Sequence, residues 1–301
     1  FVRQQDIICD FSTSDSWVVL SPIEQSIKKK IEAVGTPLKD WDIQINYGIK
    51  TGCNEAFIIS TEKRKEILDN CQTEDERKRT AELIRPILRG RDIKRYGYVD
   101  NGLFLINTHN GIRNKLPRID INDYPAVKTH LDQYWDRIST RTDKGDTPYN
   151  LRNCAYLEDF SKPKVVYMEI QTDNPEEGYP FPCYSYDDNR CIVLNTAYIM
   201  SSETTDPRYV LGILNSRLGK FLVKLYVIQL QERQFRMLSQ YVMNFPIAHP
   251  TKEQENEMIH LVQDVLVHQS LASEKRIDNL AFQIYGLTEI EIKSLMRVCQ
   301  N

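Results

Sequence analysis

The periodicity of the apolar residues changes once along this chain, at the segment Phe245-Pro246-Ile247-Ala248-His249-Pro250. Before that segment, strand-like runs such as 41–47 and 164–170 alternate with stretches of helical spacing. After it, the apolar residues follow helical spacing only. Proline interrupts both kinds of regular structure, so the segment is a natural boundary. We therefore predict a mixed α/β (α+β) domain, with mixed sheets and flanking helices, over residues 1–249, followed by a C-terminal helical segment over residues 250–301.

Shorter signals place individual elements within this outline. Ser21-Pro22-Ile23-Glu24 combines a capping box with proline at the first helical position, which predicts a helix through about Val34. The runs 41–47 and 56–59 predict two strands, joined as a hairpin by the turn Gly48-Ile49-Lys50-Thr51-Gly52. Asp206-Pro207 predicts the start of a single helix whose apolar face continues to Leu225.

The composition is that of an ordinary soluble protein, with 301 residues, a formal net charge of −3 and a mean hydropathy of −0.48. No apolar run approaches the roughly 20 residues that span a bilayer, and the start of the chain lacks the pattern of a signal peptide. The seven cysteines are scattered and never form a C-x-x-C pair, which favours a reducing compartment. We expect a cytoplasmic protein with no membrane partner. Because Phe1 is not Met, we also expect a fragment of a longer chain.

The sequence lacks the motifs of several enzyme classes. It has neither the Pro-Pro pair of an amino-methyltransferase loop nor the G-x-G of a nucleotide-binding turn. The turn 48–52 does not have the form of a phosphate-binding loop. Glu76-Arg77-Lys78 and Glu291-Ile292-Lys293 match a nuclease triplet, but both fall in capped helices, where we expect solvated faces. His260 and His268 are expected on a helix surface. We predict no catalytic residue and no metal ligand in this chain.

Positive charge is concentrated in two segments, although the whole chain is slightly acidic. Five basic residues and one acid lie between Arg85 and Arg95, and the same numbers lie between Arg217 and Arg236. The acids gather elsewhere, for example around 173–177. A positive face suited to phosphate groups is therefore compatible with the net charge.

Two segments of the sequence are distinctive, and others occur with them in a fixed order. The distinctive ones are Gly48-Ile49-Lys50-Thr51-Gly52-Cys53-Asn54-Glu55-Ala56-Phe57 and Arg85-Pro86-Ile87-Leu88-Arg89-Gly90-Arg91-Asp92-Ile93-Lys94-Arg95-Tyr96. The others are Thr36–Trp41, Lys162–Tyr167, Asn195–Tyr198, Leu211–Leu218, Phe245–Ile247 and Ile284–Ile292. Over nearly its whole length, the chain resembles the C-terminal specificity domain of TaqI-like and Eco57I-like adenine methyltransferases, including fused type IIG restriction enzymes.

This resemblance implies a target-recognition domain over residues 1–249, whose partner is double-stranded DNA. It implies that the domain presents duplex DNA to an N6-adenine methyltransferase domain of the parent chain, which normally precedes this region and is absent here. S-adenosylmethionine is expected in that missing domain, and no cofactor is expected in this chain. The parent is expected to be an adenine-specific restriction–modification methyltransferase, with or without a fused endonuclease. The helices after residue 250 are expected to pack on the partner domain or to act as a spacer.

Candidate DNA-binding residues follow from the basic clusters and exposed turns. Arginine offers a planar fork that bridges phosphate oxygens or reads guanine O6 and N7, and most such contacts position the duplex. The alternative for the first cluster is that Arg85 and Asp92 are used in a local structural ion pair. Tyr167, Tyr198 and Trp135 are expected in the core. The candidates are Lys50, Thr51, Asn54, Arg89, Arg91, Lys94, Arg95, Arg141, Lys144, Arg233 and Arg236.

Three other functions remain open on the sequence. One is a separate specificity subunit of a modification or defence complex. Another is a protein-interaction module that binds only its partner chain, which predicts no DNA affinity even at low salt. The third is a free-standing nuclease using Glu76 or Glu291, which predicts metal-dependent cleavage that is lost when either residue is replaced by Ala.

Overall fold

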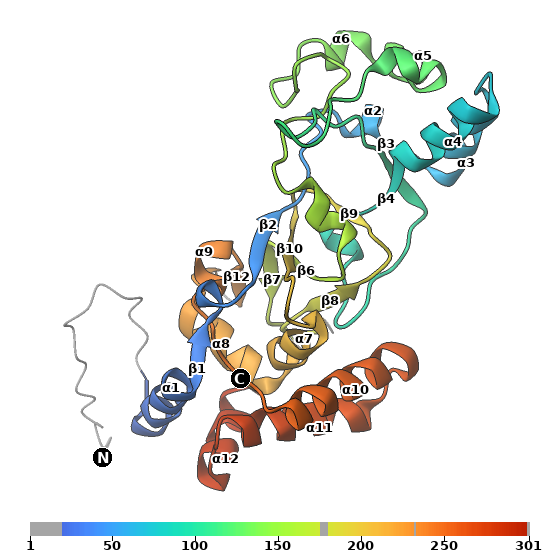
Figure 1. Cartoon of the computed structure of the whole chain (residues 1–301). Helices are drawn as coiled ribbons and strands as arrows, with labels where there is room; N and C mark the ends of the chain where they lie inside the picture. The colour runs from blue at the N-terminus through green and yellow to red at the C-terminus, as the bar shows by residue number, and fades with distance from the viewer. Residues whose placement is uncertain (1–19, 175–179, 232, 300–301) are drawn as a thin grey trace.

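A four-stranded antiparallel sheet lies between two hydrophobic cores in the computed structural model, which describes residues 20–174, 180–231 and 233–299 (Figure 1). Successive side chains of a strand point to opposite faces, so Val165 and Tyr167 enter the first core, whereas Val166 and Ile199 enter the second. Burial on both faces explains the continuous apolar runs 165–168 and 197–200 in the two central strands. The strand order is β2 (Gln44–Tyr47), β10 (Ala197–Ser201), β6 (Lys164–Met168) and β8 (Tyr184–Asp187).

The first core is completed by the long helices at the bottom of Figure 1. Capping boxes that begin at Ser21, Thr251 and Thr288 start three of these helices, as the sequence predicts for Ser21. The helices are α1 (Pro22–Val34), α7 (Pro207–Asn215), α8 (Arg217–Tyr226), α9 (Ser239–Val242), α10 (Lys252–His268), α11 (Leu271–Ile284) and α12 (Glu289–Val298). Two small sheets adjoin them, β1 (Gly35–Pro37) with β13 (Pro246–Ala248), and β11 (Gln229–Gln231), β12 (Gln234–Arg236) and β7 (Ile170–Thr172).

The second core lies at the other end of the body, under a second four-stranded sheet. The order of that sheet is β3 (Ile58–Ser60), β5 (Leu103–Ile106), β4 (Ile84–Leu88) and β9 (Ile192–Val193), and only the β4–β9 pair is parallel within it. Its helices are α2 (Asn54–Phe57), α3 (Thr61–Asp69), α4 (Glu74–Leu83), α5 (Pro125–Asp132) and α6 (Trp135–Ile138). Short 3-10 turns are η1 (Leu38–Asp40), η2 (Gly90–Asp92), η3 (Ile121–Asp123) and η4 (Leu157–Ser161).

The predicted mixed α/β class is confirmed. The helices α10, α11 and α12 after the predicted boundary share the first core with α1, α7 and α8. In the described part of the chain, none of the helices has the length and apolar character needed to cross a membrane.

The predicted hairpin of 41–47 with 56–59 is wrong. The N–H of Gly48 bonds to Ala197 O at 2.9 Å and that of Ile49 to Val193 O at 2.8 Å, so the chain leaves β2 along the β9–β10 connection and does not turn back. Ala56 and Phe57 both donate to Cys53 O, which makes the start of the second run a helical turn, α2. Only its end is strand, and that strand, β3, pairs with β5.

The single helix predicted from Asp206 to Leu225 is two helices. Ser216 has extended backbone angles (φ −70°, ψ 170°), which end α7. Its hydroxyl accepts a bond from Gly219 N at 3.2 Å and so caps α8. The apolar face continues through the break because both helices cover the first core, and this is why the sequence periodicity does not reveal the break.

Candidate nucleic-acid interface

Three chain segments that are distant in the sequence meet at one turn, residues 193–197, which we call the junction turn. Asn195 donates its backbone N–H to Ile49 O at 3.1 Å. Gly90 donates its N–H to the Thr196 hydroxyl at 2.9 Å. Glu169 donates its N–H to Thr196 O at 3.1 Å. The junction turn therefore brings together the turn after β2, the turn after β4 and the end of β6.

Backbones approach one another closely at this meeting point, which excludes a side chain at residue 48 and disfavours one at residue 90. A Cβ added to Gly48 would lie 2.2 Å from Leu194 O, and one added to Gly90 would lie 3.0 Å from Thr196 O. The first distance is a severe clash with backbone, and the second is a tight contact. Gly48 and Gly90 belong to the two distinctive sequence segments, 48–57 and 85–96. Each segment therefore carries a glycine at the place where its backbone meets the junction turn.

The turn 48–54 is joined to the loop 141–152 by the guanidinium of Arg141. Only 6% of Arg141 is exposed, and its Nη atoms donate to the carbonyl oxygens of Thr51, Asp143 at 2.5 Å, Pro148 at 3.1 Å and Asn150 at 2.5 Å. Its guanidinium also lies 4.5 Å from the centre of the Phe57 ring. Burial lowers the pKa of Arg141 to about 10, so the group is still a cation at neutral pH.

Arg141 was predicted to bind DNA, and the structure places it inside the protein instead. Thr51 is buried as well, and its hydroxyl donates to Asn54 Oδ1 at 2.5 Å. Lys50 is half-buried and Asn54 is exposed. Lys144 is exposed, and its ammonium donates to Ser139 O at 2.7 Å. In the loop 141–152, Lys144 is therefore exposed to solvent, whereas Arg141 is buried and fixes the loop to the turn 48–54.

In the basic segment 89–95, two cations are exposed and two are ion-paired with carboxylates. Arg89 binds buried Asp92 with two bonds, Nε to Oδ2 at 2.9 Å and Nη2 to Oδ1 at 2.8 Å. Burial by itself would raise the pKa of Asp92, but the Arg89 bonds outweigh it and hold the pKa below its usual value. Arg91 and Lys94 are exposed, with Lys94 Nζ donating to Arg91 O at 3.2 Å. Arg95 turns away and binds Glu274 of α11 at 2.7 Å.

The alternative ion pair between Arg85 and Asp92 is not formed. Arg85 donates to Arg190 O at 2.5 Å, and the carboxylate of Asp92 is taken by Arg89. The local ion pair predicted for this segment thus exists with a different arginine, because the 3-10 turn η2 places residues 89 and 92 on one side.

The hairpin β11–β12 extends the surface on the other side of the junction turn. Arg236 is about half exposed, and its Nε binds Glu169 Oε1 at 2.9 Å. Arg233 is exposed at the end of the hairpin with φ +63°. Phe235 points the opposite way, and its ring stacks on Phe181 at 5.2 Å. The hairpin is therefore anchored by its inner face and presents its arginines on the outer one.

The predicted residues fall into three groups in the described part of the chain. Five are at least partly exposed and have no carboxylate partner there: Lys50, Arg91, Lys94, Lys144 and Arg233. Arg89, Arg95 and Arg236 are each paired with an acid. Thr51 and Arg141 are buried, and Asn54 is exposed but accepts the Thr51 hydroxyl. The fold thus joins the segments that carry the turns at 50, 91 and 233 through the junction turn and Glu169, with fewer unpaired cations in the described residues than the sequence indicates.

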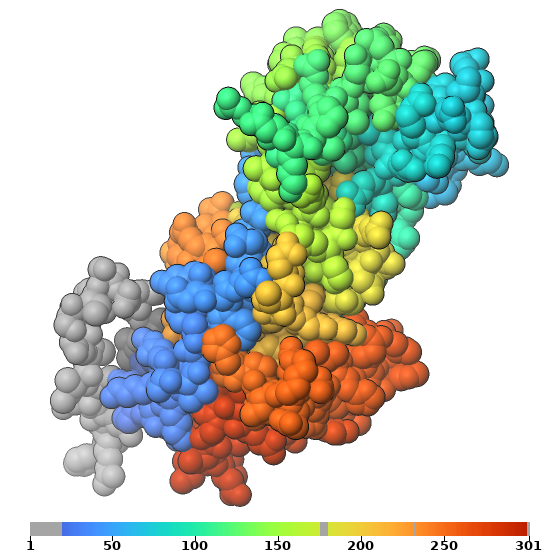
Figure 2. Space-filling view, viewed as in Figure 1, coloured from blue at the N-terminus to red at the C-terminus, as the bar shows by residue number. Residues whose placement is uncertain are grey.

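Sequence reasoning missed the neutral residues of this surface. Gln229 and Gln231 of β11 are exposed beside the two hairpin arginines. Tyr47 is also exposed, at the end of β2, and its ring lies 6.1 Å from that of Tyr156. These side chains are neutral and lie in short strands, so no cluster of charge marks them in the sequence. Their exposure became visible only once the strand pairing was known. In the space-filling view, β2 and its neighbours form the narrower middle of the body, between the broader ends built on the two cores (Figure 2).

Two expectations about aromatic and acidic side chains need correction. Trp135, expected in the core, is 44% exposed on α6, whereas Tyr167 and Tyr198 are buried as predicted. Glu76 and Glu291, expected on solvated faces, are buried. Glu76 accepts the backbone N–H groups of Gln72 and Ala126, at 2.8 and 3.0 Å, because it joins α4 to the start of α5.

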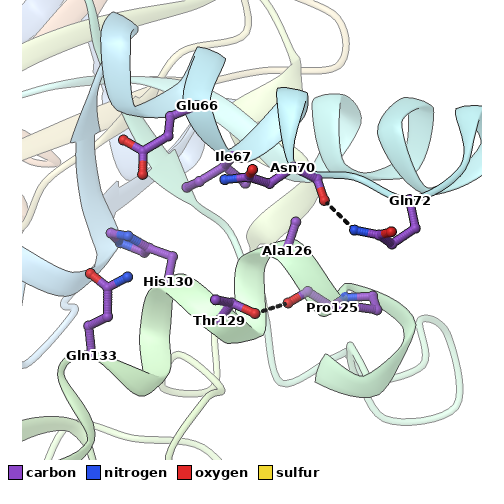
Figure 3. A pocket seen from close by; sticks show the side chains of 9 residues that line it. All are labelled: Glu66, Ile67, Asn70, Gln72, Pro125, Ala126, Thr129, His130 and Gln133. Atoms are coloured by element: carbon purple, nitrogen blue, oxygen red, sulfur yellow. Dashed lines mark hydrogen bonds between the residues drawn. The ribbon is translucent and has the colours of Figure 1, made fainter.

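A pocket of about 330 Å³ lies between α3 and α5, outside the surface described above (Figure 3). Its lining is mainly neutral and polar, with one carboxylate, Glu66, that pairs with Lys63 at 2.6 Å. The imidazole of His130 is buried, donates from Nε2 to Ala56 O at 3.0 Å, and has its pKa lowered by burial. Among the residues that the structure describes, no three His, Cys, Asp or Glu side chains are placed to hold a metal ion.

Comparison with known proteins is consistent with the arrangement of these segments. The type II methyltransferase M.BstVI of Geobacillus stearothermophilus is 22% identical over 292 residues, which are 94% of this chain and 46% of that protein. The type II methyltransferase M.BanIII of Aneurinibacillus aneurinilyticus is 21% identical over 265 residues, covering 82% of this chain and 42% of that protein. The chain thus spans less than half the length of either relative.

Two solved structures share the fold. The type IIL restriction-modification enzyme MmeI, in complex with DNA, superposes with a TM-score of 0.59 at 15% identity, over 88% of this chain and 36% of that one. The type IIG restriction endonuclease BpuSI superposes with a TM-score of 0.51 at 13% identity, over 88% and 34%. A family model described as the TaqI-like C-terminal specificity domain matches residues 85–247, more than half of the chain and most of the segments that meet at the junction turn. This chain therefore belongs to the family of TaqI-like C-terminal specificity domains.

Proposed function

We propose that this chain recognises duplex DNA for a type II restriction–modification enzyme and presents it to an N6-adenine methyltransferase domain that lies outside the chain. The observation that carries the proposal is the junction turn, which bonds directly to the segments carrying Lys50 and Arg91 and, through Glu169, to the hairpin carrying Arg233, with all three cations at least partly exposed. Cations held on one connected surface can follow a phosphate track, which scattered cations cannot.

The hairpin β11–β12 is the element we assign to base recognition. A two-stranded ribbon fits the major groove of B-DNA. Arginine binds guanine, and glutamine binds adenine, each through two hydrogen bonds. The hairpin exposes both kinds of side chain, as Arg233, Arg236, Gln229 and Gln231. Glu169 holds Arg236 in one orientation, which reduces the side-chain entropy lost when that arginine meets a base.

The lengths of the relatives support a separate catalytic domain. Both are called methyltransferases, and this chain matches less than half of each. We propose that S-adenosylmethionine and the target adenine are bound by that other part of the parent protein. An endonuclease fused to the parent would, by the same division, lie outside this chain.

We also propose that residues 1–249 form the recognition part and that residues 250–301 brace it. Three ion pairs across this boundary support a bracing role. They are Lys30 with Glu291 at 2.7 Å, Arg95 with Glu274 at 2.7 Å, and Arg217 with Asp278 at 3.1 Å. Arg95 thereby ties the basic segment 89–95 to α11, so the brace fixes the neighbouring exposed residues Arg91 and Lys94.

DNA binding is tested by fluorescence anisotropy of the chain with a labelled duplex of about 30 base pairs, over a range of salt concentrations. We expect the logarithm of the binding constant to fall linearly with the logarithm of salt, with a slope of about −0.9 for each phosphate contacted. Arg91→Gln and Arg233→Gln are expected to weaken binding, and Lys78→Gln on the exposed face of α4 serves as the matched control. The absence of binding at low salt would reject DNA recognition and favour a protein-interaction module.

A further inference from the structure

A tight basic turn at residues 112–116 projects from the second core and plays no part in the interface described above. Ile112 and Leu116 pair through two backbone bonds, Ile112 N to Leu116 O at 2.8 Å and Leu116 N to Ile112 O at 2.9 Å. Between them lie Arg113, Asn114 and Lys115, all exposed, with Asn114 at φ +60°. The turn therefore presents three consecutive polar side chains, two of them cationic.

The base of the turn is fixed firmly to the rest of the protein. Gly111 has φ +76°, and a Cβ there would lie 2.5 Å from Leu116 O, so only glycine fits. Asn150 donates to Ile119 O at 2.9 Å, and Arg118 binds Asp146 at 3.3 Å. These contacts tie the basic turn to the loop 141–152, whose base is held by Arg141. Its cations are thus presented on a fixed backbone and not on a free loop.

A chain of contacts connects the basic turn to the junction surface. Lys115 pairs with Glu158 of η4, and the neighbouring Asp159 accepts a bond from Asn46 of β2 at 3.1 Å. The hydroxyl of Tyr156 donates to Tyr47 O at 3.1 Å. Tyr47 in turn is paired in register with Tyr198 of β10, at the end of the junction turn. The basic turn is therefore connected to β2 through the segment 156–159.

We propose that the basic turn 112–116 is a second DNA contact, which grips the phosphate backbone without reading sequence; this inference rests on the proposed function. Arg113 has no hydrogen bond or ion pair within the described residues, so its guanidinium is available to a phosphate. Lys115 and Glu158 are 61% and 54% exposed, and an ion pair between such exposed groups is worth little. A phosphate can therefore take the place of Glu158 at small cost.

DNA is the partner that the surroundings favour over an acidic protein. The three side chains at the tip of the turn are hydrogen-bond donors suited to phosphate oxygens, and no large apolar residue on the tip is exposed. A protein interface would need buried apolar side chains at its centre. The turn is also linked through η4 to β2, which leads into the turn that carries Lys50, and a duplex extends over many base pairs.

The test compares the salt dependence of duplex binding for the wild-type chain and the double variant Arg113→Gln/Lys115→Gln. Two lost phosphate contacts should reduce the magnitude of the salt slope by about 2 and weaken binding at about 0.1 M salt by tenfold or more. The loss should be equal for duplexes of different sequence. The control is Lys65→Gln/Lys78→Gln, which removes the same charge from α3 and α4, on the side of the body away from β2 (Figure 1). That variant should bind as the wild type does.

A second variant, Glu158→Gln, removes the acid that competes for Lys115 and should tighten binding. Far-UV circular dichroism and urea midpoints confirm that the variants are folded. A wild-type chain that binds DNA while Arg113→Gln/Lys115→Gln keeps its affinity and slope would overturn this inference and leave the proposed function intact. An equal loss in the Lys65→Gln/Lys78→Gln control would also overturn it, because net charge would then explain the effect. A wild-type chain that binds no duplex would overturn the proposed function itself.

Discussion

Replacing Arg141 by Ala should destabilise the protein by about 3 kcal/mol. Among the described residues, the carbonyl groups of Thr51, Asp143 and Pro148 receive no bond other than from this guanidinium. The carbonyl of Asn150 keeps a second bond, from Gly145 N at 3.0 Å. At about 1 kcal/mol for each of three buried or half-buried acceptors left without a donor, the loss is about 3 kcal/mol. Contact with the Phe57 ring adds up to about 1 kcal/mol, and water entering the loop offsets part of the total.

Arg141→Lys should lose about 2 kcal/mol, because one ammonium keeps the charge but cannot reach four carbonyl groups at once. Arg152→Gln is the matched control, since Arg152 is half exposed, and its 3.3 Å pair with Asp143 should contribute less than about 1 kcal/mol. Urea unfolding gives the free energies, and amide hydrogen exchange of residues 48–54 and 141–152 reports the joint between turn and loop. A loss below about 1 kcal/mol in Arg141→Ala, with unchanged exchange in both segments, would refute the role we give to this guanidinium.

Three further changes test the packing and the brace. Gly48→Ala should cost about 3 kcal/mol in urea unfolding, because its methyl group would lie 2.2 Å from Leu194 O, whereas Gly97→Ala meets no atom within 4 Å and should be nearly neutral. Burial by itself would raise the pKa of Glu291, but the bonds from Lys30, Thr288 and Ser26 outweigh it and lower the pKa to about 2. Because this folded pKa is depressed, its stabilisation is complete above about pH 4.5 and is lost as the pH falls to about 2, so Glu291→Gln should lose about 2 kcal/mol at pH 7 and show a flatter stability profile over that acid range. Asp173→Asn should cost about 3 kcal/mol in urea unfolding, since it leaves the buried ammonium of Lys220, 2.7 Å away, without its carboxylate, and an unchanged urea midpoint would contradict that reasoning.

Local signals in the sequence determined the start of several elements and the class of the fold. The capping box at Ser21 begins α1 where predicted, because a cap needs only residues three apart in the chain. The change of periodicity at 245–250 is followed directly by the C-terminal helices, of which α10 begins at Lys252. Helical spacing, like a cap, depends only on residues a few positions apart in the chain. The order of the distinctive segments likewise indicated the family that the match over residues 85–247 shows.

Tertiary structure decided which side chains are free to act. Arg91 and Arg141 have the same chemistry in the sequence, yet one is exposed and the other is enclosed by carbonyl groups from the turn 48–54 and its own loop. Glu76 became a buried acceptor because α5, fifty residues later, places Ala126 N against it. The energy of a charged group depends on its partners and its distance from water, and both are set by segments far apart in the chain. The sequence therefore determined the class of the fold, the start of several elements and the family, whereas only the packing of distant segments determined which side chains are exposed.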